Sequence, residues 1–254
     1  MAQHVAFAFM SMPDDVVRNI LTTWLLNEDV ATADSAFCST VDRPRFVQLL
    51  HKAQLHNRWD QFYESFPVVP FLLWSIAKST KLHFLALDGK STYSTAFTSG
   101  ALENLVVFAK VVRVGNDAGL RLVAKHAKQL EELRIILPHN GTDGTTFNRT
   151  LTNVSSLVVD ACLHGMASPD CFLSLTKVLP NLKYCNAQVT CIRNDEVISL
   201  LQHCPHLTEL NCNHCPHINN SIFTTQSPSL QKLHVVAATL RPCLRLNPKL
   251  TNST

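Results

Sequence analysis

One short pattern, Leu-x-x-Leu-x-Leu, recurs through the last two thirds of the chain and constrains the fold more than any other feature. Successive copies begin between 20 and 28 residues apart. A unit of this length cannot bury its apolar side alone, so the copies must stack against one another. Alternate residues of an extended chain point to the same side, which predicts one strand in every unit. The seven copies begin at Leu82, Leu102, Leu130, Val154, Leu179, Leu207 and Leu230.

The segments between these copies carry apolar residues at helical spacing. After Asn194, four such residues ending at Cys204 fall at i, i+3, i+4 and i+7 of one helix face. Similar patterns follow Asn116 and Ser168. A strand and a helix therefore alternate, and we expect an α/β solenoid of curved parallel strands with outer helices.

The composition indicates a folded protein without a nucleic-acid or membrane partner. Hydrophobic residues make up 46% of the chain and charged residues 16%, and the net charge of +3 is spread without a basic run. No stretch of about 18 apolar residues is present, so we expect no membrane span. Nine cysteines, an odd number, occur without a secretory signal. This favours reduced thiols and a cytoplasmic or nuclear protein.

Three helices are expected before the repeats. Pro13 and the two acids after it suit a first helical turn, with Ser11 as its N-cap, and apolar pairs then recur at helical spacing as far as Trp24. Further helix starts are at Asn27 and Arg43. The predicted organisation is an N-terminal tail (1–10), a small all-α three-helix domain (11–55), a helical connector (56–78) and a domain of about seven repeats (79–254).

A cluster of cysteine and histidine residues at 203–217 allows two interpretations. Cys212 and Cys215 have the two-residue spacing of zinc ligands, and four converging ligands would bind the metal. The repeat register instead assigns both, with Cys204, to buried positions where small apolar thiols pack well, and we favour this interpretation. The chain carries no Gly-x-Ser-x-Gly, phosphate-loop or His-Glu-x-x-His motif, so we expect no catalytic site, cofactor or metal.

Two stretches resemble parts of one protein family. Residues 198–218, Ile-Ser-Leu-Leu-Gln-His-Cys-Pro-His-Leu-Thr-Glu-Leu-Asn-Cys-Asn-His-Cys-Pro-His-Ile, resemble the cysteine-containing leucine-rich repeat typical of F-box proteins. Residues 12–25, Met-Pro-Asp-Asp-Val-Val-Arg-Asn-Ile-Leu-Thr-Thr-Trp-Leu, resemble the opening of an F-box. Met12 replaces the usual leucine, and Arg43-Pro-Arg-Phe46 stands roughly where a tryptophan is expected. The chain thus resembles an F-box/leucine-rich-repeat protein.

This resemblance implies a non-catalytic substrate receptor of an SCF-type (cullin–RING) ubiquitin ligase. The F-box would dock on a Skp-family adaptor, and the repeats would bind a protein substrate. An alternative is a leucine-rich-repeat scaffold or inhibitor whose helices only cap the solenoid, without any link to a ubiquitin ligase. The resemblance implies that the F-box core and the adaptor contact share Pro13, Val16, Val17, Ile20, Leu21 and Trp24.

Strand geometry predicts which residues would face a protein substrate. In each copy the leucines point inward, and the residues flanking them point to the concave face. Aromatic anchors are expected near Phe84 and Phe108, unless these two side chains pack on the connector. The predicted substrate-binding residues are Phe84, Asp88, Asn104, Phe108, Glu132, Arg134, Asp160, Lys183, Glu209, Asn211, Lys232 and His234.

Overall fold

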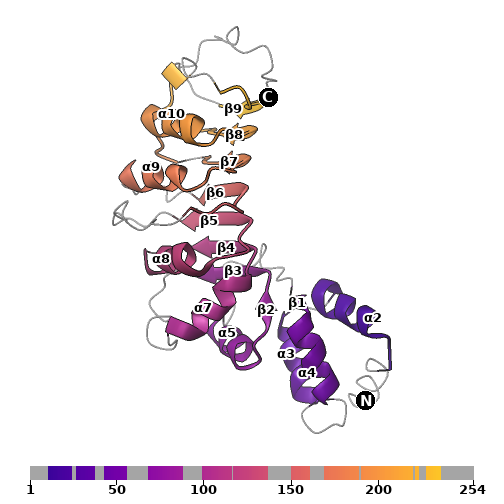
Figure 1. Ribbon diagram of the computed structural model, residues 1–254. Helices are drawn as coiled ribbons and strands as arrows, with labels where there is room; N and C mark the ends of the chain where they lie inside the picture. The colour runs from indigo at the N-terminus through magenta and orange to yellow at the C-terminus, as the bar shows by residue number, and fades with distance from the viewer. Residues whose placement is uncertain are drawn as a thin grey trace. The chain divides into compact units, whose positions relative to one another are not determined.

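The computed structural model divides the chain into two compact units (Figure 1). The first comprises Met1–Leu85 with Lys90–Lys110, and the second comprises Ala86–Gly89 with Val111–Thr254. No helix among the described residues is long and apolar enough to cross a membrane. The structure describes residues 11–24, 27–37, 43–55, 68–87, 99–115, 117–136, 150–160, 169–188, 190–219, 221–222 and 227–235.

The first unit opens with three helical segments, as the sequence predicts. α2 (Asp14–Asn19) runs directly into a π-helical turn, η1 (Ile20–Trp24), and α3 (Asn27–Ala36) and α4 (Arg43–Lys52) follow. The expectation that Ser11 caps the first helix is wrong, because Pro13 holds the N-cap position and no side chain caps the turn. Two acids in that turn stabilise the positive end of the helix dipole instead. The buried side chains of these segments include Val17, Leu21, Val30, Phe46, Leu49 and Leu50.

A buried carboxylate ties α3 to α4 and to α5 (Val68–Ala77). The Asp34 side chain on α3 is only 6% exposed and accepts a hydrogen bond from Trp74 Nε1 at 3.1 Å. It also forms ion pairs with Lys78 Nζ at 3.0 Å and with Arg43 Nη2 at 3.6 Å. A buried acid is tolerated only when it is paired, so this network holds the three helices in one arrangement.

Parallel strand pairing already begins in the first unit. β1 (Gln54–Leu55) pairs with β2 (Lys81–Leu82), and the partners Leu55 and Leu82 are both fully buried. The backbone extends this pairing, because His83 N donates to Leu55 O at 2.9 Å and Lys110 N donates to His83 O at 3.0 Å. Parallel stacking therefore starts one strand ahead of the first copy of the sequence pattern.

The strand predicted at Leu102 is wrong. These residues form α7 (Ser99–Phe108), and the next strand is β4 (Val111–Val114). The pattern is carried instead by Ala109, Val112 and Val114, which are all fully buried. Alanine in the first position hid this copy, and the apolar run before it fits helical spacing as well as strand spacing.

The second unit is a leucine-rich-repeat solenoid with one parallel sheet. Its strands follow chain order: β3 (Phe84–Leu87), where the two units divide, then β4, β5 (Glu132–Ile136), β6 (Ser156–Asp160), β7 (Tyr184–Asn186), β8 (Glu209–Asn211) and β9 (Lys232–His234). In Figure 1 the described helices of this unit lie on one side of the strand stack. They are α8 (Asp117–His126), α9 (Pro169–Lys177) and α10 (Asn194–His203), close to the bounds that the sequence predicts.

Strand register aligns one row of inward side chains through the sheet. Leu133 pairs with Leu157, Leu157 with Cys185, and Cys185 with Leu210, and all four are fully buried. The copy predicted to begin at Leu179 is therefore out of register. It runs as Leu182-x-x-Cys185-x-Ala187, which turns Tyr184 outward although the sequence pattern placed it inside. Leu179 is also buried and lies three residues before Leu182, so it resembles the first leucine of the pattern.

Candidate protein-binding surfaces

The outward residues of β4 to β9 form one surface, here called the strand face. In each strand, one residue before and one after the inward residue lie beside their partners on the neighbouring strands. All of them are half-buried or exposed. The strand face comprises Val111, Arg113, Glu132, Arg134, Ser156, Val158, Tyr184, Asn186, Glu209, Asn211, Lys232 and His234. Six predicted substrate-binding residues lie on it: Glu132, Arg134, Glu209, Asn211, Lys232 and His234.

Two charged clusters occupy separate parts of the strand face. On β5, Glu132 Oε1 accepts a hydrogen bond from Arg134 Nε. On β8 and β9, Glu209 pairs with Lys232 Nζ at 3.2 Å and with His234 Nε2 at 3.4 Å. Both carboxylates are thus paired within the surface, so neither presents an unpartnered negative charge.

Between these clusters, β6 and β7 present a neutral centre. Ser156, Val158, Tyr184 and Asn186 are all half-buried, and the Ser156 hydroxyl donates to the second oxygen of Glu132 at 3.3 Å. An aromatic and an aliphatic side chain surrounded by charged residues is the usual anatomy of a protein-binding surface.

Tyr184 remains a neutral phenol in this environment. Partial burial raises the pKa of Tyr184, and the carboxylates of Glu209 and Glu132 raise it further, while a hydrogen bond from Asn186 acts in the opposite direction. The residue before it, Lys183, is exposed at the edge of the strand face. Its carbonyl accepts the backbone N–H of Thr208 at 2.8 Å and that of Glu209, the first residue of β8, at 3.1 Å. This anchors the lysine backbone while its side chain extends into solvent.

The asparagines of the strand face serve the fold. Asn186 Oδ1 accepts the Gln188 N–H at 3.1 Å, and Asn211 Oδ1 accepts the Asn213 N–H at 3.0 Å. Asn211 Nδ2 also donates to Gln188 Oε1 at 3.3 Å. Asparagine side chains that bond two residues ahead turn the chain after a strand. The amide of Asn211 is therefore already occupied within the repeats.

Several predicted substrate-binding residues are not on the strand face. Phe84 is only 7% exposed, so its ring belongs to the core rather than to a binding surface. Asn104 and Phe108 lie on α7, because the strand expected there is a helix, and the Phe108 ring instead receives a lysine ammonium 5.0 Å from its centroid. Asp88 and the side chain of Asp160 lie outside the described residues.

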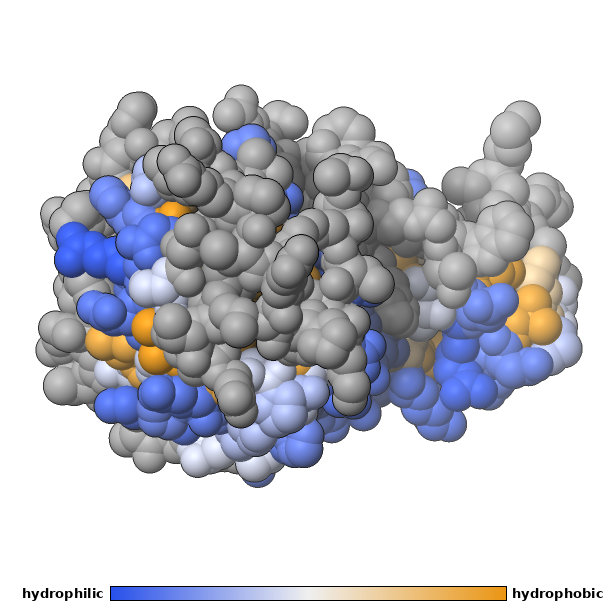
Figure 2. Space-filling model, turned by 90° about the horizontal axis from the view of Figure 1, so that it is seen from above, coloured by the Kyte–Doolittle hydropathy of each residue, from blue (hydrophilic) through white to orange (hydrophobic). Residues whose placement is uncertain are grey.

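A second candidate surface lies along α2, the two residues before it and the start of η1, which together carry apolar residues on two sides. Val17 and Leu21 are buried, whereas Met12 is 37% exposed and Val16 is 40% exposed. The predicted adaptor residues therefore separate into a core pair and an exposed set, and the side chain of Trp24 lies outside the described residues. Figure 2 shows hydrophobic atoms at the surface of the right-hand lobe, which holds the N-terminal helices. The α2 face is defined as Met12, Pro13, Val16 and Ile20.

Arg45 on α4 holds the start of α2. Its guanidinium donates to Asp14 Oδ1, at 2.6 Å from Nη2 and 3.1 Å from Nε, and Nη2 also donates to Met12 O at 2.8 Å. The hydrogen bond to Arg45 lowers the pKa of Asp14. A planar guanidinium that makes several hydrogen bonds at once fixes orientation better than a single point charge does. Arg45 thereby orients the segment that carries the exposed apolar side chains.

The cysteines of the Cys/His cluster lie in the core, as the preferred interpretation predicts. Cys204, Cys212 and Cys215 are at most 1% exposed, whereas His206 and His214 are exposed. Burial raises the pKa of Cys204 to about 12. A hydrogen bond with Cys215, together with burial, raises the pKa of Cys212 well above its ordinary value. Among the described residues, no group of three metal-binding side chains is placed to hold a metal ion.

Ser199, which the sequence pattern did not single out, is hydrogen-bonded on α10 to His203, the first residue of the Cys/His cluster. Thr176 Oγ1 lies 2.8 Å from Leu173 O, to which it donates, and 3.1 Å from Ser199 Oγ. The Thr176 hydrogen is thus in use, so the Ser199 hydroxyl donates to Thr176 Oγ1 and accepts from His203 Nδ1 at 3.3 Å. His203 Nδ1 also donates to the Ser199 carbonyl at 2.9 Å. His203 is the donor in this chain and does not activate the hydroxyl. The arrangement joins α9 to α10.

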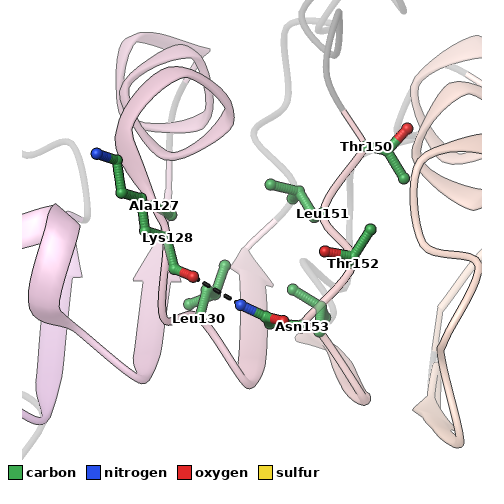
Figure 3. Close-up of a pocket in the computed structure, with 8 residues that line it drawn as sticks. Ala127, Lys128, Leu130, Thr150, Leu151, Thr152 and Asn153 are labelled. Carbon is green, nitrogen blue, oxygen red and sulfur yellow. Dashed lines mark hydrogen bonds between the residues drawn. The ribbon is translucent and has the colours of Figure 1, made fainter.

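A small hollow lies between two repeats of the second unit (Figure 3). It is lined by residues 127, 128, 130 and 150–154 and holds about 20 Å³, room for about one water molecule. Asn153 Nδ2 crosses it to donate to Lys128 O at 2.7 Å, and Asn181 makes the corresponding bond to Thr152 O at 2.8 Å. The hollow is too small for an organic ligand, and its asparagine belongs to a structural ladder between repeats.

No protein-family model matches this sequence, and no curated protein matches it. Solved structures of similar fold do exist. The chain superposes on a chain of the Rad7–Elc1 complex from yeast with a TM-score of 0.57 at 11% identity, covering 89% of this chain and 64% of that one. It thus spans less than two thirds of the yeast chain.

Two further structures are more distant. The leucine-rich repeat-containing protein LegL7 from Legionella pneumophila gives a TM-score of 0.42 at 14% identity, over 78% of this chain and 70% of that one. A chain of the TLR13–ssRNA13 complex gives 0.44 at 12% identity, over 80% of this chain and 32% of that one. At these identities the yeast likeness supports the fold alone.

Proposed function

We propose that this chain is the substrate-recognition subunit of an SCF-type ubiquitin ligase. The N-terminal helices dock on a Skp-family adaptor, and through it on a cullin–RING ligase, while the repeats hold a protein substrate. The chain contributes proximity and no bond chemistry, and it acts in the cytoplasm or the nucleus. The alternative is a leucine-rich-repeat scaffold or inhibitor that uses the strand face without any ubiquitin ligase.

The α2 face is the observation that supports adaptor docking most strongly. A helix that only sealed the end of a solenoid would need one apolar side, and α2 with η1 has that side in Val17 and Leu21. The exposed Met12 and Val16 add a second apolar side that the described part of the fold does not use. Exposed apolar residues gathered on one helix face mark a protein-interaction site.

The rest of the structure is compatible with this role. The strand face offers a neutral centre between paired charges, which suits a protein substrate. The yeast structure of similar fold holds Rad7 together with a second protein, Elc1, so the fold occurs in a protein complex. We therefore assign adaptor docking to the α2 face and substrate binding to the strand face.

Adaptor binding by isothermal titration calorimetry tests the proposal. Wild-type chain should bind a Skp-family adaptor, and Val16→Asp should weaken binding at least about tenfold, because a carboxylate would be desolvated at the interface. Leu73→Asp on α5 is the matched control, since Leu73 is an equally apolar side chain that is 44% exposed but lies outside the α2 face. It should bind the adaptor like wild type.

Failure of the wild type to bind any Skp-family adaptor would reject the ligase role and leave the scaffold or inhibitor role. Equal weakening by Val16→Asp and Leu73→Asp would place the contact elsewhere than the α2 face. Thermal melting of both variants should match wild type, because both substituted side chains are exposed.

A further inference from the structure

The strand face carries an excess of positive charge that its own carboxylates do not balance. The strand face itself holds two carboxylates, Glu132 and Glu209, against the cations Arg113, Arg134 and Lys232. At its edge, the residues that directly precede the strands add Glu131 against Lys110 and Lys183. The two carboxylates are committed to Arg134 and to the Lys232–His234 pair. The surface as a whole therefore attracts a negatively charged partner.

Lys183 differs from the paired cations Arg134 and Lys232 of this surface. Within the described part of the chain it forms no ion pair, and its side chain is exposed. Its backbone is nevertheless fixed, because its carbonyl accepts Thr208 N at 2.8 Å, Glu209 N at 3.1 Å and Thr208 Oγ1 at 2.9 Å. Because the backbone is already anchored, pairing with an incoming acid has to order only the lysine side chain and not the main chain.

Next to Lys183 lies the neutral centre of the strand face. Tyr184 follows it directly, and Val158 lies on the neighbouring strand, diagonal to Tyr184, because Tyr184 pairs with Ser156. Diagonal neighbours on one sheet face are within reach of an aromatic ring. Half-buried Tyr184 and Val158 can therefore cover one apolar side chain of a partner, and the exposed Lys183 directly precedes Tyr184 at the edge of the strand face.

We propose that Lys183, Tyr184 and Val158 form the anchor point of the strand face for a protein segment in which an aspartate or glutamate adjoins an aromatic or aliphatic residue. The carboxylate pairs with Lys183, and the apolar side chain packs on Tyr184 and Val158. This rests on the proposed substrate-binding role of the strand face and specifies the chemical class of the substrate segment. It moves the aromatic anchor away from Phe84 and Phe108, which the structure places in the core and on a helix.

Selection of peptides on the full-length chain tests this anchor directly. A random-peptide display library is selected on wild type, on Lys183→Glu, on Tyr184→Ala and on Lys177→Glu. Lys177 is the matched control, because it is an exposed lysine at the end of α9 and its substitution changes the net charge equally. Circular dichroism should show all four proteins folded, since the altered side chains are exposed or half-buried.

Wild type and Lys177→Glu should enrich peptides in which Asp or Glu stands next to Phe, Tyr or Leu. Lys183→Glu should enrich Lys or Arg at the same place and bind the wild-type peptides about fivefold more weakly, as expected for a rim ion pair. Tyr184→Ala should bind them at least about tenfold more weakly, as expected for a central aromatic residue.

Three results would overturn the anchor. Wild type could enrich basic or uncharged segments, Lys183→Glu could enrich the same segments as wild type, or wild type could enrich acidic segments no more than Tyr184→Ala does. The selection contains no adaptor, and the calorimetric assay contains no peptide. Loss of the acidic preference with intact adaptor binding would therefore reject this anchor and leave the ligase role standing. An intact acidic preference together with loss of adaptor binding would reject the ligase role alone.

Discussion

The register of β7 decides which side chains face a partner, and two aspartate substitutions test it. Cys185 is fully buried and pairs with Leu157 and Leu210, whereas its neighbour Tyr184 is half-buried on the strand face. Cys185→Asp would place a carboxylate among leucines that offer it no hydrogen-bond donor. Tyr184→Asp would place the same group at the edge of solvent, near Glu209.

The two substitutions should differ clearly in their effect on the free energy of unfolding. Burial of an unpaired polar group costs about 2–7 kcal/mol, so we expect Cys185→Asp to lower stability by about 4 kcal/mol or more. Tyr184→Asp loses a half-buried ring and gains a like-charge neighbour, which together cost about 1–2 kcal/mol. At about 2–4 °C per kcal/mol for a chain of this size, Cys185→Asp should melt at least about 8 °C below wild type.

Urea and thermal unfolding followed by far-ultraviolet circular dichroism measure both variants. Cys185→Glu and Tyr184→Glu serve as a second pair, since they repeat the comparison with a longer side chain. Equal destabilisation by the two aspartates, or greater destabilisation by Tyr184→Asp, would mean that Tyr184 faces inward. The strand face and the anchor point on it would then be wrongly assigned.

Two further predictions concern buried titratable groups. Burial raises the pKa of Cys204 to about 12 from 9.0, so the unfolded chain loses this proton first and stability falls as pH rises from 9 toward 12. Urea unfolding at pH 8 and pH 10 should show that the free energy of unfolding falls by about 1 kcal/mol less in Cys204→Ala than in wild type. An equal fall in both proteins would contradict the assignment. Asp34→Ala should lower stability by about 2–4 kcal/mol, because it strips Lys78 and Arg43 of their shared partner, and Asp34→Asn should lower it less, because an amide oxygen still accepts from Trp74. Tryptophan fluorescence during urea unfolding measures the second effect, and no difference between Asp34→Ala and wild type would contradict the network.

Much of the fold follows from periodicity in the sequence, because stacking repeats impose the same inward row on every unit. The helices beginning near Asp117, Pro169 and Asn194 and the strands at Glu132, Ser156 and Glu209 match the predicted pattern. Leucine occurs at the inward positions of these units, and the helices between them have one apolar stripe each. Local spacing and tertiary packing therefore point to the same register there.

The two errors of register have one physical cause. Stacking selects side chains by volume and burial, and small residues can hold an inward position as well as leucine does. Ala109 and Cys185 are such residues, and the predicted copies instead begin at leucines that precede them, Leu102 and Leu179. Only the backbone pairing between strands shows which residue is at the inward position, because a shift of one residue along a strand moves every side chain to the other face.

The candidate surfaces were predictable to different degrees. The outward charges on β5, β8 and β9 follow from strand alternation, so Glu132, Arg134 and Glu209 were found from sequence. The pairing of these charges, the lack of an ion pair at Lys183 among the described residues and the outward position of Tyr184 depend on contacts between strands. On α2, periodicity identified the apolar residues but could not say that Val17 packs inside while Val16 stays exposed.

Hydrogen exchange of the full chain, alone and with a Skp-family adaptor, tests the central claim most directly. We predict slower exchange in peptides covering residues 12–24 when the adaptor is bound, because docking on the α2 face restricts opening of α2 and η1. Peptides covering β5, β6 and β7 should exchange at unchanged rates, since the strand face remains available to a substrate. Unchanged exchange at 12–24, or slowed exchange in the strands, would contradict the assignment of adaptor docking to the α2 face.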